Sequence, residues 1–313
     1  MRSVVRSLAA LTAVAALTAC APRGTSLAPA PAAGFALRDA RSMAPLTVAQ
    51  LADSIARVRV VLFGEYHDDA GVHRAQQALL EALAARDVPV VLSLEMFERD
   101  VQPVLDAWLS GTLGDSAFRA SSRLWPNYGT DYRPALELAK RRRWPVIAAN
   151  VPRPIASATA RAGLALLDTI APAQRRLVAR TLDCPTTDDY HARFVAVMSG
   201  GGGAGHGGST MPNAAVERFY QAQCIKDETM AESIAEALTR ATPGTVVVHL
   251  TGAFHSDHRL GTASRVLRRV PDATMRTLTT VRVAGDTRAL ADTVRARADW
   301  LVITPEPTPA PTR

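Results

Sequence analysis

The sequence predicts an α/β fold: a mostly parallel sheet flanked by helices on both faces, with a helical cap subdomain. Short, continuously apolar runs rich in β-branched residues alternate with segments in which Ala and Leu recur at helical spacing. Strands that are apolar on both sides are buried on both sides, so the sheet needs helices on each face. Residues 154–240 break the alternation and have mostly helical patterns. We expect them to form a cap over the sheet.

The elements follow one another in a single domain, which we place at residues 45–304. The expected strands are 58–63, 88–94, 145–149, 245–250, 273–283 and 299–304. The expected helices are 72–86, 100–109, 131–143, 213–240 and one that begins after Gly261. Pro243-Gly244 ends the longest of these helices, because proline cannot continue a helix and glycine favours its end.

The first twenty residues are typical of a lipoprotein signal peptide. Arg2 and Arg6 precede an apolar run that is too short to span a bilayer, which takes about 20 residues. The run ends in Leu17-Thr-Ala-Cys20, which resembles the lipobox where a cysteine is acylated. We therefore predict export and lipid anchoring through Cys20, to the outer membrane, on its periplasmic or surface face. An ordinary signal peptide with a chance cysteine is the alternative.

Three further segments differ in composition from the domain. Residues 21–44 begin with a stretch rich in Ala and Pro and are expected to be a flexible tether. Residues 305–313 alternate Pro with Thr and Ala and are expected to be a disordered tail. A glycine-rich run at residues 199–209, which contains His206, is expected to be a flexible insertion; a mobile lid or a metal-binding His206 are the alternatives.

Composition and charge limit the classes of partner that we expect. The chain has 313 residues, 48% of them apolar, and a net charge of +7. Lys140-Arg-Arg-Arg143 closes a predicted helix, where cations suit the helix dipole. No nucleic-acid motif is present, so we expect no nucleic acid partner, whereas an acidic small molecule or an anionic lipid surface stays open. Cys184 and Cys224 are expected to form a disulfide in an oxidising compartment; free thiols or metal ligands are the alternatives.

Polar residues follow four of the predicted strands. They are Gly64-Glu65-Tyr66-His67-Asp68, Glu95, Asn150 with Arg153 close behind, and Gly252-Ala-Phe-His255. Because ligands of open α/β sheets bind outside the carboxyl ends of the strands, we expect these residues to share one pocket. Taken singly, Glu65 could be a solvated loop acid and His255 a hydrogen-bonded core histidine.

In order along the chain, these motifs resemble those of the ChaN-like lipoproteins. The resemblance covers roughly residues 45–283. The motifs are 64–68, Glu95-Met-Phe-Glu-Arg99 with Gln102, Ala149-Asn-Val-Pro-Arg153, Ala222-Gln-Cys-Ile-Lys-Asp-Glu-Thr-Met-Ala-Glu-Ser-Ile234 and 252–255. It implies a haem-binding protein of iron uptake, in a superfamily with the Tiki metalloproteases and the erythromycin esterases. The implied partners are haem and an outer-membrane haem receptor, with a homodimer left open.

The resemblance also implies a tyrosine on the haem iron. The five choices are Tyr66, Tyr128, Tyr132, Tyr190 and Tyr220. A phenolate suits ferric haem, and Tyr66 lies within the predicted site. The residues expected to contact the cofactor are Tyr66, His67, Asn150, Arg153 and His255, with Arg153 able to pair with a propionate. Trp125, Tyr128 and Tyr132, with Pro126 and Pro134, either stack on the porphyrin or form the cap's own core.

A metal-dependent hydrolase, peptidase-like or esterase-like, is the alternative function. Glu65, His67, Glu95 and His255 would then hold zinc or manganese, and a bound water would be the nucleophile. In a metal-free variant, His67 or His255 would act as a general base. A structural envelope protein with a relic site is a third interpretation, and the polar strand ends count against it, because unpaired buried acids cost stability.

Overall fold

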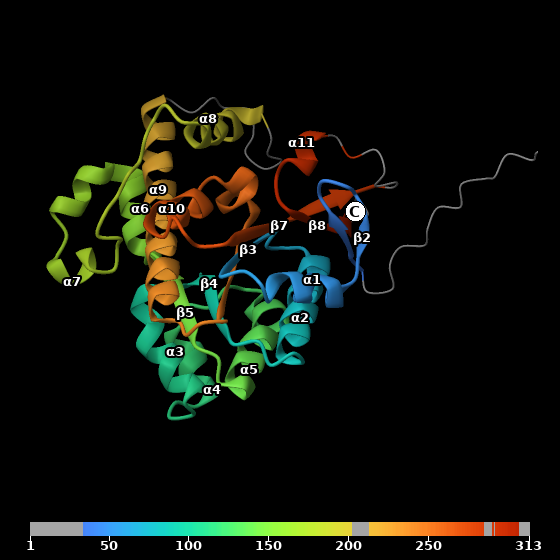
Figure 1. The fold of residues 1–313 in the computed structure, drawn as a ribbon. Helices are drawn as coiled ribbons and strands as arrows, with labels where there is room; N and C mark the ends of the chain where they lie inside the picture. Colours follow the sequence, from blue (N-terminus) through green and yellow to red (C-terminus); the bar gives the residue numbers. More distant parts are fainter. Residues whose placement is uncertain (1–33, 202–212, 285–289, 291, 307–313) are drawn as a thin grey trace, which may run out of the picture.

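The computed structural model describes residues 34–201, 213–284, 290 and 292–306. One eight-stranded sheet, in the order β2-β1-β8-β7-β3-β6-β4-β5, runs through the molecule (Figure 1). Its six parallel strands are β3 (Val60–Glu65), β4 (Val90–Glu98), β5 (Val146–Asn150), β6 (Val246–Gly252), β7 (Met275–Val283) and β8 (Trp300–Pro305). Each of them overlaps a strand expected from the sequence, and the predicted fold class is confirmed.

Two antiparallel strands extend one edge of the sheet. They are β1 (Ala36–Asp39), which pairs with β8, and β2 (Pro45–Leu46), which pairs with β1. Residues 36–39 were predicted to belong to the flexible tether, and that assignment is wrong. Phe35 and Leu37 are buried against the core, and this apolar contact orders the segment. The predicted tail is one residue too long, because Pro305 ends β8. Cys20, His206 and most of the tether and tail lie outside the described residues.

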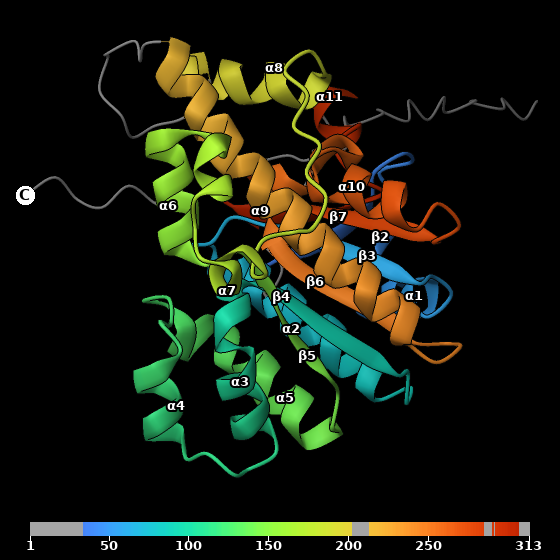
Figure 2. The same cartoon turned by 90° about the vertical axis from the view of Figure 1, so that its left-hand side faces the viewer.

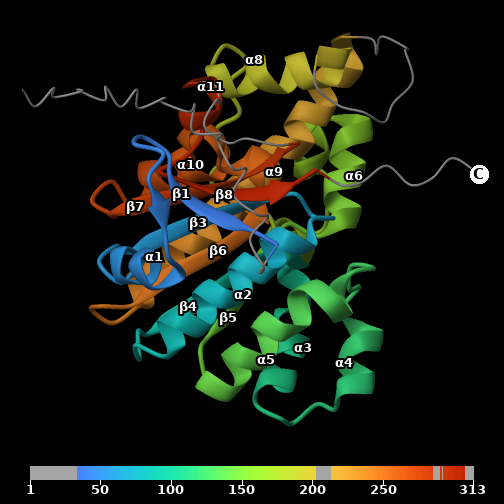
Figure 3. The ribbon, with the colours of Figure 1, turned by 90° about the vertical axis from the view of Figure 1, so that its right-hand side faces the viewer.

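The pleat of the sheet divides its side chains between two helical layers. Val61 and Phe63 of β3 face the layer of α1 (Val48–Ile55), α2 (Ala70–Ala84) and α5 (Arg133–Arg142), which Figure 3 shows in front of the sheet. Val60 and Leu62 face the opposite layer, where α9 (Asn213–Arg240) and α10 (Thr262–Arg269) pack. In Figure 2, α9 runs diagonally across this second face. Helices on both faces explain why the strands are apolar throughout.

The remaining helices lie around these layers. They are α3 (Gln102–Leu109), α4 (Asp115–Ser121), α6 (Arg153–Ala162), α7 (Pro172–Arg175), α8 (Asp189–Ala196) and α11 (Asp292–Arg295), with 3₁₀ turns at Arg99–Val101, Leu164–Asp168, Ala253–His255 and Asp257–Arg259 and π turns at Tyr128–Tyr132 and Val197–Gly201. Residues 154–240 are mostly helical, as predicted, but α9 packs on the sheet instead of capping it. Among the described helices, none is both long and apolar enough to cross a bilayer.

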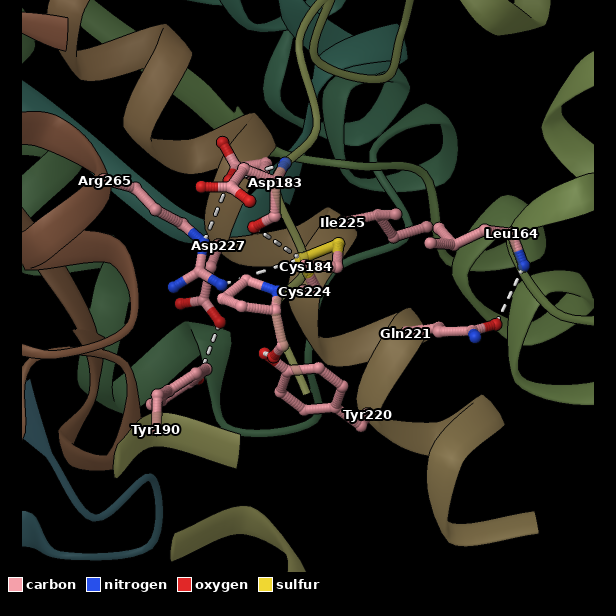
Figure 4. The surroundings of a disulfide bond; sticks show 12 residues. Leu164, Asp183, Cys184, Tyr190, Tyr220, Gln221, Cys224, Ile225, Asp227 and Arg265 are labelled. Carbon is pink, nitrogen blue, oxygen red and sulfur yellow. Dashed lines mark hydrogen bonds and ion pairs between the residues drawn. A yellow bond between two sulfur atoms is a disulfide. The ribbon is translucent and has the colours of Figure 1, made fainter. Parts of the chain in front are cut away.

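The segment that carries α7 and α8 is tied to α9 by a disulfide. Cys184 and Cys224, predicted to pair, are joined by an S–S bond (Figure 4). The bond lies three residues before Asp227 on α9, to which Tyr190 of α8 donates a hydrogen bond. The disulfide therefore holds the α8 segment next to a buried acid of the long helix.

We predict that Cys184→Ser/Cys224→Ser lowers the free energy of unfolding by up to about 4 kcal/mol, because the bond closes a loop with a sequence separation of 40 residues. Urea unfolding with and without reductant measures this loss. Reductant should lower the stability of the wild type and leave the double variant unchanged. Mass spectrometry of an unreduced digest should find the linked peptides, and two freely alkylated thiols would refute the pairing.

Candidate functional site

The polar residues predicted to share a site gather where the strands end, but on two faces of the sheet. Glu65 ends β3 on the same side as Phe63, facing α2 and α5. Glu95 of β4 follows Val91 and Ser93 on the opposite side, facing α9. The pleat thus separates two carboxylates that come from neighbouring parts of one sheet edge.

Glu65 is the centre of the first hydrogen-bond network. Its side chain is buried, and Tyr132 donates to Glu65 Oε1 at 2.6 Å while Gln76 Nε2 of α2 donates to Oε2 at 2.5 Å. His67 Nδ1 lies 2.8 Å from Oε1. Three partners therefore satisfy both carboxylate oxygens, as a buried charge requires.

Glu95 and His255 form the second network, on the α9 side. Glu95 Oε2 accepts hydrogen bonds from Thr251 Oγ1 and from the Gly252 amide, both at 2.7 Å. His255 Nε2 lies 3.4 Å from Glu95 Oε1, and His255 Nδ1 lies 2.7 Å from Asp227 Oδ1 on α9. The imidazole is held between two buried carboxylates.

This arrangement stabilises the charged form of each partner. Burial acts to lower the pKa of His255, but the charges of Glu95 and Asp227 outweigh it and raise the pKa to about 10. Burial acts to raise the pKa of Glu95 and of Asp227, but His255 outweighs burial and lowers both, that of Glu95 well below its usual value. Near neutral pH the trio therefore carries two negative charges and one positive charge.

His67 connects the two networks across the end of the sheet. A Cβ atom at Gly252 would lie 3.0 Å from His67 Nε2 and 3.7 Å from Glu95 Oε2, so the glycine leaves room for the ring. Burial acts to lower the pKa of His67, but the hydrogen bond with Glu65 and the charge of Glu95 raise it overall. The side chain is 41% exposed and packs edge-on against Trp125, with 4.7 Å between ring centroids.

The other predicted contact residues differ in accessibility. Tyr66 is half-buried, with the guanidinium of Arg282 4.7 Å from its ring centroid. Asn150 is buried and donates to the Glu95 carbonyl at 3.1 Å. Arg153 begins α6 with a side chain that is 64% exposed, 3.7 Å from Glu98. The structure places Glu65, His67, Glu95 and His255 at one end of the sheet, divided between its two faces, and leaves Tyr66, His67 and Arg153 accessible.

Four residues that complete the networks were not predicted to have this role; the two tyrosines among them were considered only as ligands of the haem or its iron. The four are Asp227, Gln76, Tyr132 and Tyr190. Asp227 stands inside the motif 222–234, and its signal is an acid on the buried side of a helix. The pairing of Tyr132 or Gln76 with Glu65 has no local signal, because the partners lie far apart in the chain.

Comparison with known proteins identifies the family. The family model described as "Haem-binding uptake, Tiki superfamily, ChaN" matches residues 51–266, more than half of the chain. The chain belongs to this ChaN family. The resemblance seen in the five sequence motifs is thereby confirmed. No curated protein matches the chain.

A solved structure shares the fold of this ChaN-family chain. The structure described as "Cofacial heme binding to ChaN of Campylobacter jejuni" is similar with a TM-score of 0.60 at 14% identity, over 86% of this chain and 96% of that one. The type III effector HopBA1 (TM-score 0.42, 15% identity, 82% and 93% covered) and the RRSP toxin effector domain of Vibrio vulnificus (0.42, 15%, 80% and 39%) also match. At these identities the likeness to the Campylobacter protein shows the fold.

The predicted metal site is not supported. Within the described residues of this ChaN-family chain, no three His, Cys, Asp or Glu side chains are arranged to hold a metal ion. Glu65 and Glu95 face opposite sides of the sheet, and protein donors already bind their carboxylate oxygens. The hypothesis that Glu65, His67, Glu95 and His255 bind zinc or manganese for hydrolysis therefore has no support in this geometry.

His255→Gln should lower the free energy of unfolding by roughly 3–5 kcal/mol at pH 7, because it leaves Glu95 and Asp227 buried without their cation. The size of this stabilisation depends on pH. In the wild type, the contribution of His255 is complete below pH ~6.5 and is lost as the pH rises through about 10. The contributions of the two carboxylates are present above their usual pKa values and are lost as the pH falls.

Urea unfolding at pH 5, 7 and 9 measures this effect. The deficit of His255→Gln should shrink toward pH 9, because above pH ~6.5 the unfolded chain loses the histidine proton that the folded wild type keeps up to about pH 10. His191→Gln is the control, because the His191 imidazole pairs with one carboxylate, Glu217, which is itself 38% exposed. An equal deficit for His255→Gln at all three pH values would contradict the charged trio.

Proposed function

We propose that this chain is a lipid-anchored haem-binding protein of iron acquisition, in which Tyr66 binds the haem iron. Membership of the ChaN family and the shared fold with a haem-binding ChaN support haem as the ligand. The observation that carries the assignment of the iron ligand is the accessibility of the five tyrosines.

Four of the five tyrosines are unsuited to bind iron. Tyr128, Tyr132, Tyr190 and Tyr220 are at most 2% exposed. Burial raises the pKa of Tyr128 and of Tyr220 to about 12, and burial with a neighbouring carboxylate also raises the pKa values of Tyr132 and Tyr190. A raised pKa disfavours the phenolate that ferric iron prefers. Tyr66 is the one tyrosine that reaches solvent.

The surroundings of Tyr66 fit an anionic iron ligand. The guanidinium of Arg282 lies over its ring, held in place by Asp68 and Asp69. Burial acts to lower the pKa of Arg297, but Asp257 and the Tyr66 phenol raise it, which places a second cation beside the phenol. One positive charge thus lies over the ring of Tyr66, and a second lies beside its phenol group.

The neighbours of Tyr66 give the porphyrin an apolar and a polar contact. Trp125 and His67, the residue after Tyr66, are partly exposed and pack edge to face, so they offer aromatic surface to a planar ligand at this end of the sheet. Arg153 is exposed and can pair with a propionate. Asn150 and His255 are buried and bonded to protein groups, so we assign them positioning roles instead of direct contact.

Tyr66→Phe should abolish the high-spin ferric spectrum of the haem complex and weaken hemin binding at least tenfold. Absorption titration with hemin measures both. Tyr128→Phe is the matched control, because the Tyr128 hydroxyl is buried with no hydrogen-bond partner among the described residues. That variant should keep the wild-type spectrum. An unchanged spectrum in Tyr66→Phe would remove Tyr66 as the ligand, and wild-type protein without saturable hemin binding would remove the proposed function.

The anchoring part of the proposal rests on the lipobox-like sequence that ends at Cys20. Cys20→Ala should abolish labelling with radioactive palmitate in cells and leave the precursor uncleaved, because the thioether needs the thiol. Cys184→Ser in the same assay is the control and should be labelled normally. Acylation of the Cys20→Ala protein would contradict the assignment. The outer-membrane location, the receptor and the homodimer stay predictions.

A further inference from the structure

A large groove lies at the end of the sheet opposite the proposed haem site. Its volume is about 1280 Å³, and its floor comes from the first residues of β4 and from β5. The last turns of α9 form one wall, the start of α3 forms the other, and residues 176–180 close it above. In Figure 2 this part of β4 and β5 lies between α9 and α3. The volume exceeds the roughly 300–1,000 Å³ of most small-ligand pockets.

The floor of the groove is apolar. Val91 and Ala237 belong to the core between the sheet and α9, and Ile147 packs against that core while half-buried. Leu177 and Trp144 add apolar surface to the lining. An apolar floor of this kind favours a ligand with an extended hydrocarbon body.

The rim of the groove is basic. The lining contains six arginines and four acids, namely Arg99, Arg142, Arg143, Arg176, Arg180, Arg240, Asp87, Asp106, Glu232 and Glu236. Six positive and four negative side chains give the lining of the groove a net charge of two positive charges. Most of the arginines are paired: Arg99 with Glu232, Arg142 with Asp87, and Arg180 and Arg240 with Glu236.

Two rim cations remain available for a ligand. Arg143 and Arg176 are exposed, and within the described part of the chain neither side chain has a hydrogen-bond or ion-pair partner. Guanidinium groups bind carboxylates and phosphates in a forked geometry that makes them strong anion partners. The groove therefore pairs an apolar floor with unpaired cations at its rim.

The lining excludes two other occupants. It contains no His, Tyr, Cys or Met, so it offers no ligand for haem iron. A peptide cannot extend the sheet at β5 freely, because the Gln102 amide already donates to the Val146 carbonyl at 2.9 Å and accepts from the Ala148 amide at 2.7 Å.

We propose that this groove binds a single-chain acidic lipid, whose hydrocarbon chain lies on the floor and whose acid group meets the arginine rim at Arg143 and Arg176. This site is separate from the haem site and does not depend on it. Such a ligand has a long hydrocarbon chain and one acidic head group, as a fatty acid or a lysophosphatidic acid has.

Displacement of a fluorescent fatty acid from the full mature chain tests the proposal, with palmitate, a lysophosphatidic acid and neutral hexadecanol as competitors. Both acids should compete and hexadecanol should compete at least tenfold less well. Competition by palmitate alone would identify a carboxylate head, and competition by the phosphate lipid alone a phosphate head. No competition by either acid, or equal competition by the alcohol, would overturn the proposal.

Two variants locate the site. Ile147→Trp fills the floor, and Arg143→Gln/Arg176→Gln removes the free cations; each should weaken palmitate binding at least tenfold, which corresponds to about 1.4 kcal/mol or more. Arg57→Gln/Arg161→Gln is the control, because it removes the same charge from exposed positions outside the groove. If Ile147→Trp fails to fold, the surface double variant still decides. Wild-type palmitate affinity in that variant would overturn the proposal, as would hemin that displaces palmitate in competition.

Discussion

The buried acidic stripe of α9 is the constraint on which the rest of the structure depends. Asp227 holds His255 and accepts from Tyr190 and Thr262, while Glu228 is fully buried against the guanidinium of Arg265. Glu232 lies farther along the helix and pairs with Arg99. Each acid would be costly in the core without its partner, so together they restrict the helix to one rotation and one position on the sheet. The disulfide at Cys224 then holds the α8 segment against the same helix (Figure 4).

The two hydrogen-bond networks give the proposed haem site a rigid foundation. Glu65 and Glu95 are bound by donors from different helices and strands, so neither side chain is free to turn toward a ligand. His67 spans the networks and presents one ring nitrogen toward the end of the sheet. Next to this fixed edge, Tyr66 and Trp125 stay partly exposed. The same polar strand ends therefore support binding by positioning exposed neighbours, and their own oxygens are already occupied.

Much of the fold and part of the site follow from sequence patterns. The apolar strands and the helical repeats place most of the sheet, because burial on both faces leaves a local signal in the residues themselves. The strand β1 was missed, because two apolar residues, Phe35 and Leu37, stand next to an Ala-Pro-rich stretch without strand-like alternation. The predicted metal site has no support for a geometric reason: Glu65 and Glu95 end at one edge of the sheet, but the pleat directs their side chains to opposite faces.

The sequence by itself determined the fold class, the family and the edge of the sheet at which the polar residues meet. The apolar strand segments, and the motifs that follow them, can be recognised from neighbouring residues along the chain. Only the tertiary structure decided which side chains remain available to a ligand. Tyr66 is accessible and Tyr132 is buried, although both are tyrosines near the same edge, because accessibility depends on which distant segment packs over each residue. The groove at Ile147 likewise exists only because α9 and α3 flank β5 without covering it. No local sequence pattern predicts this arrangement.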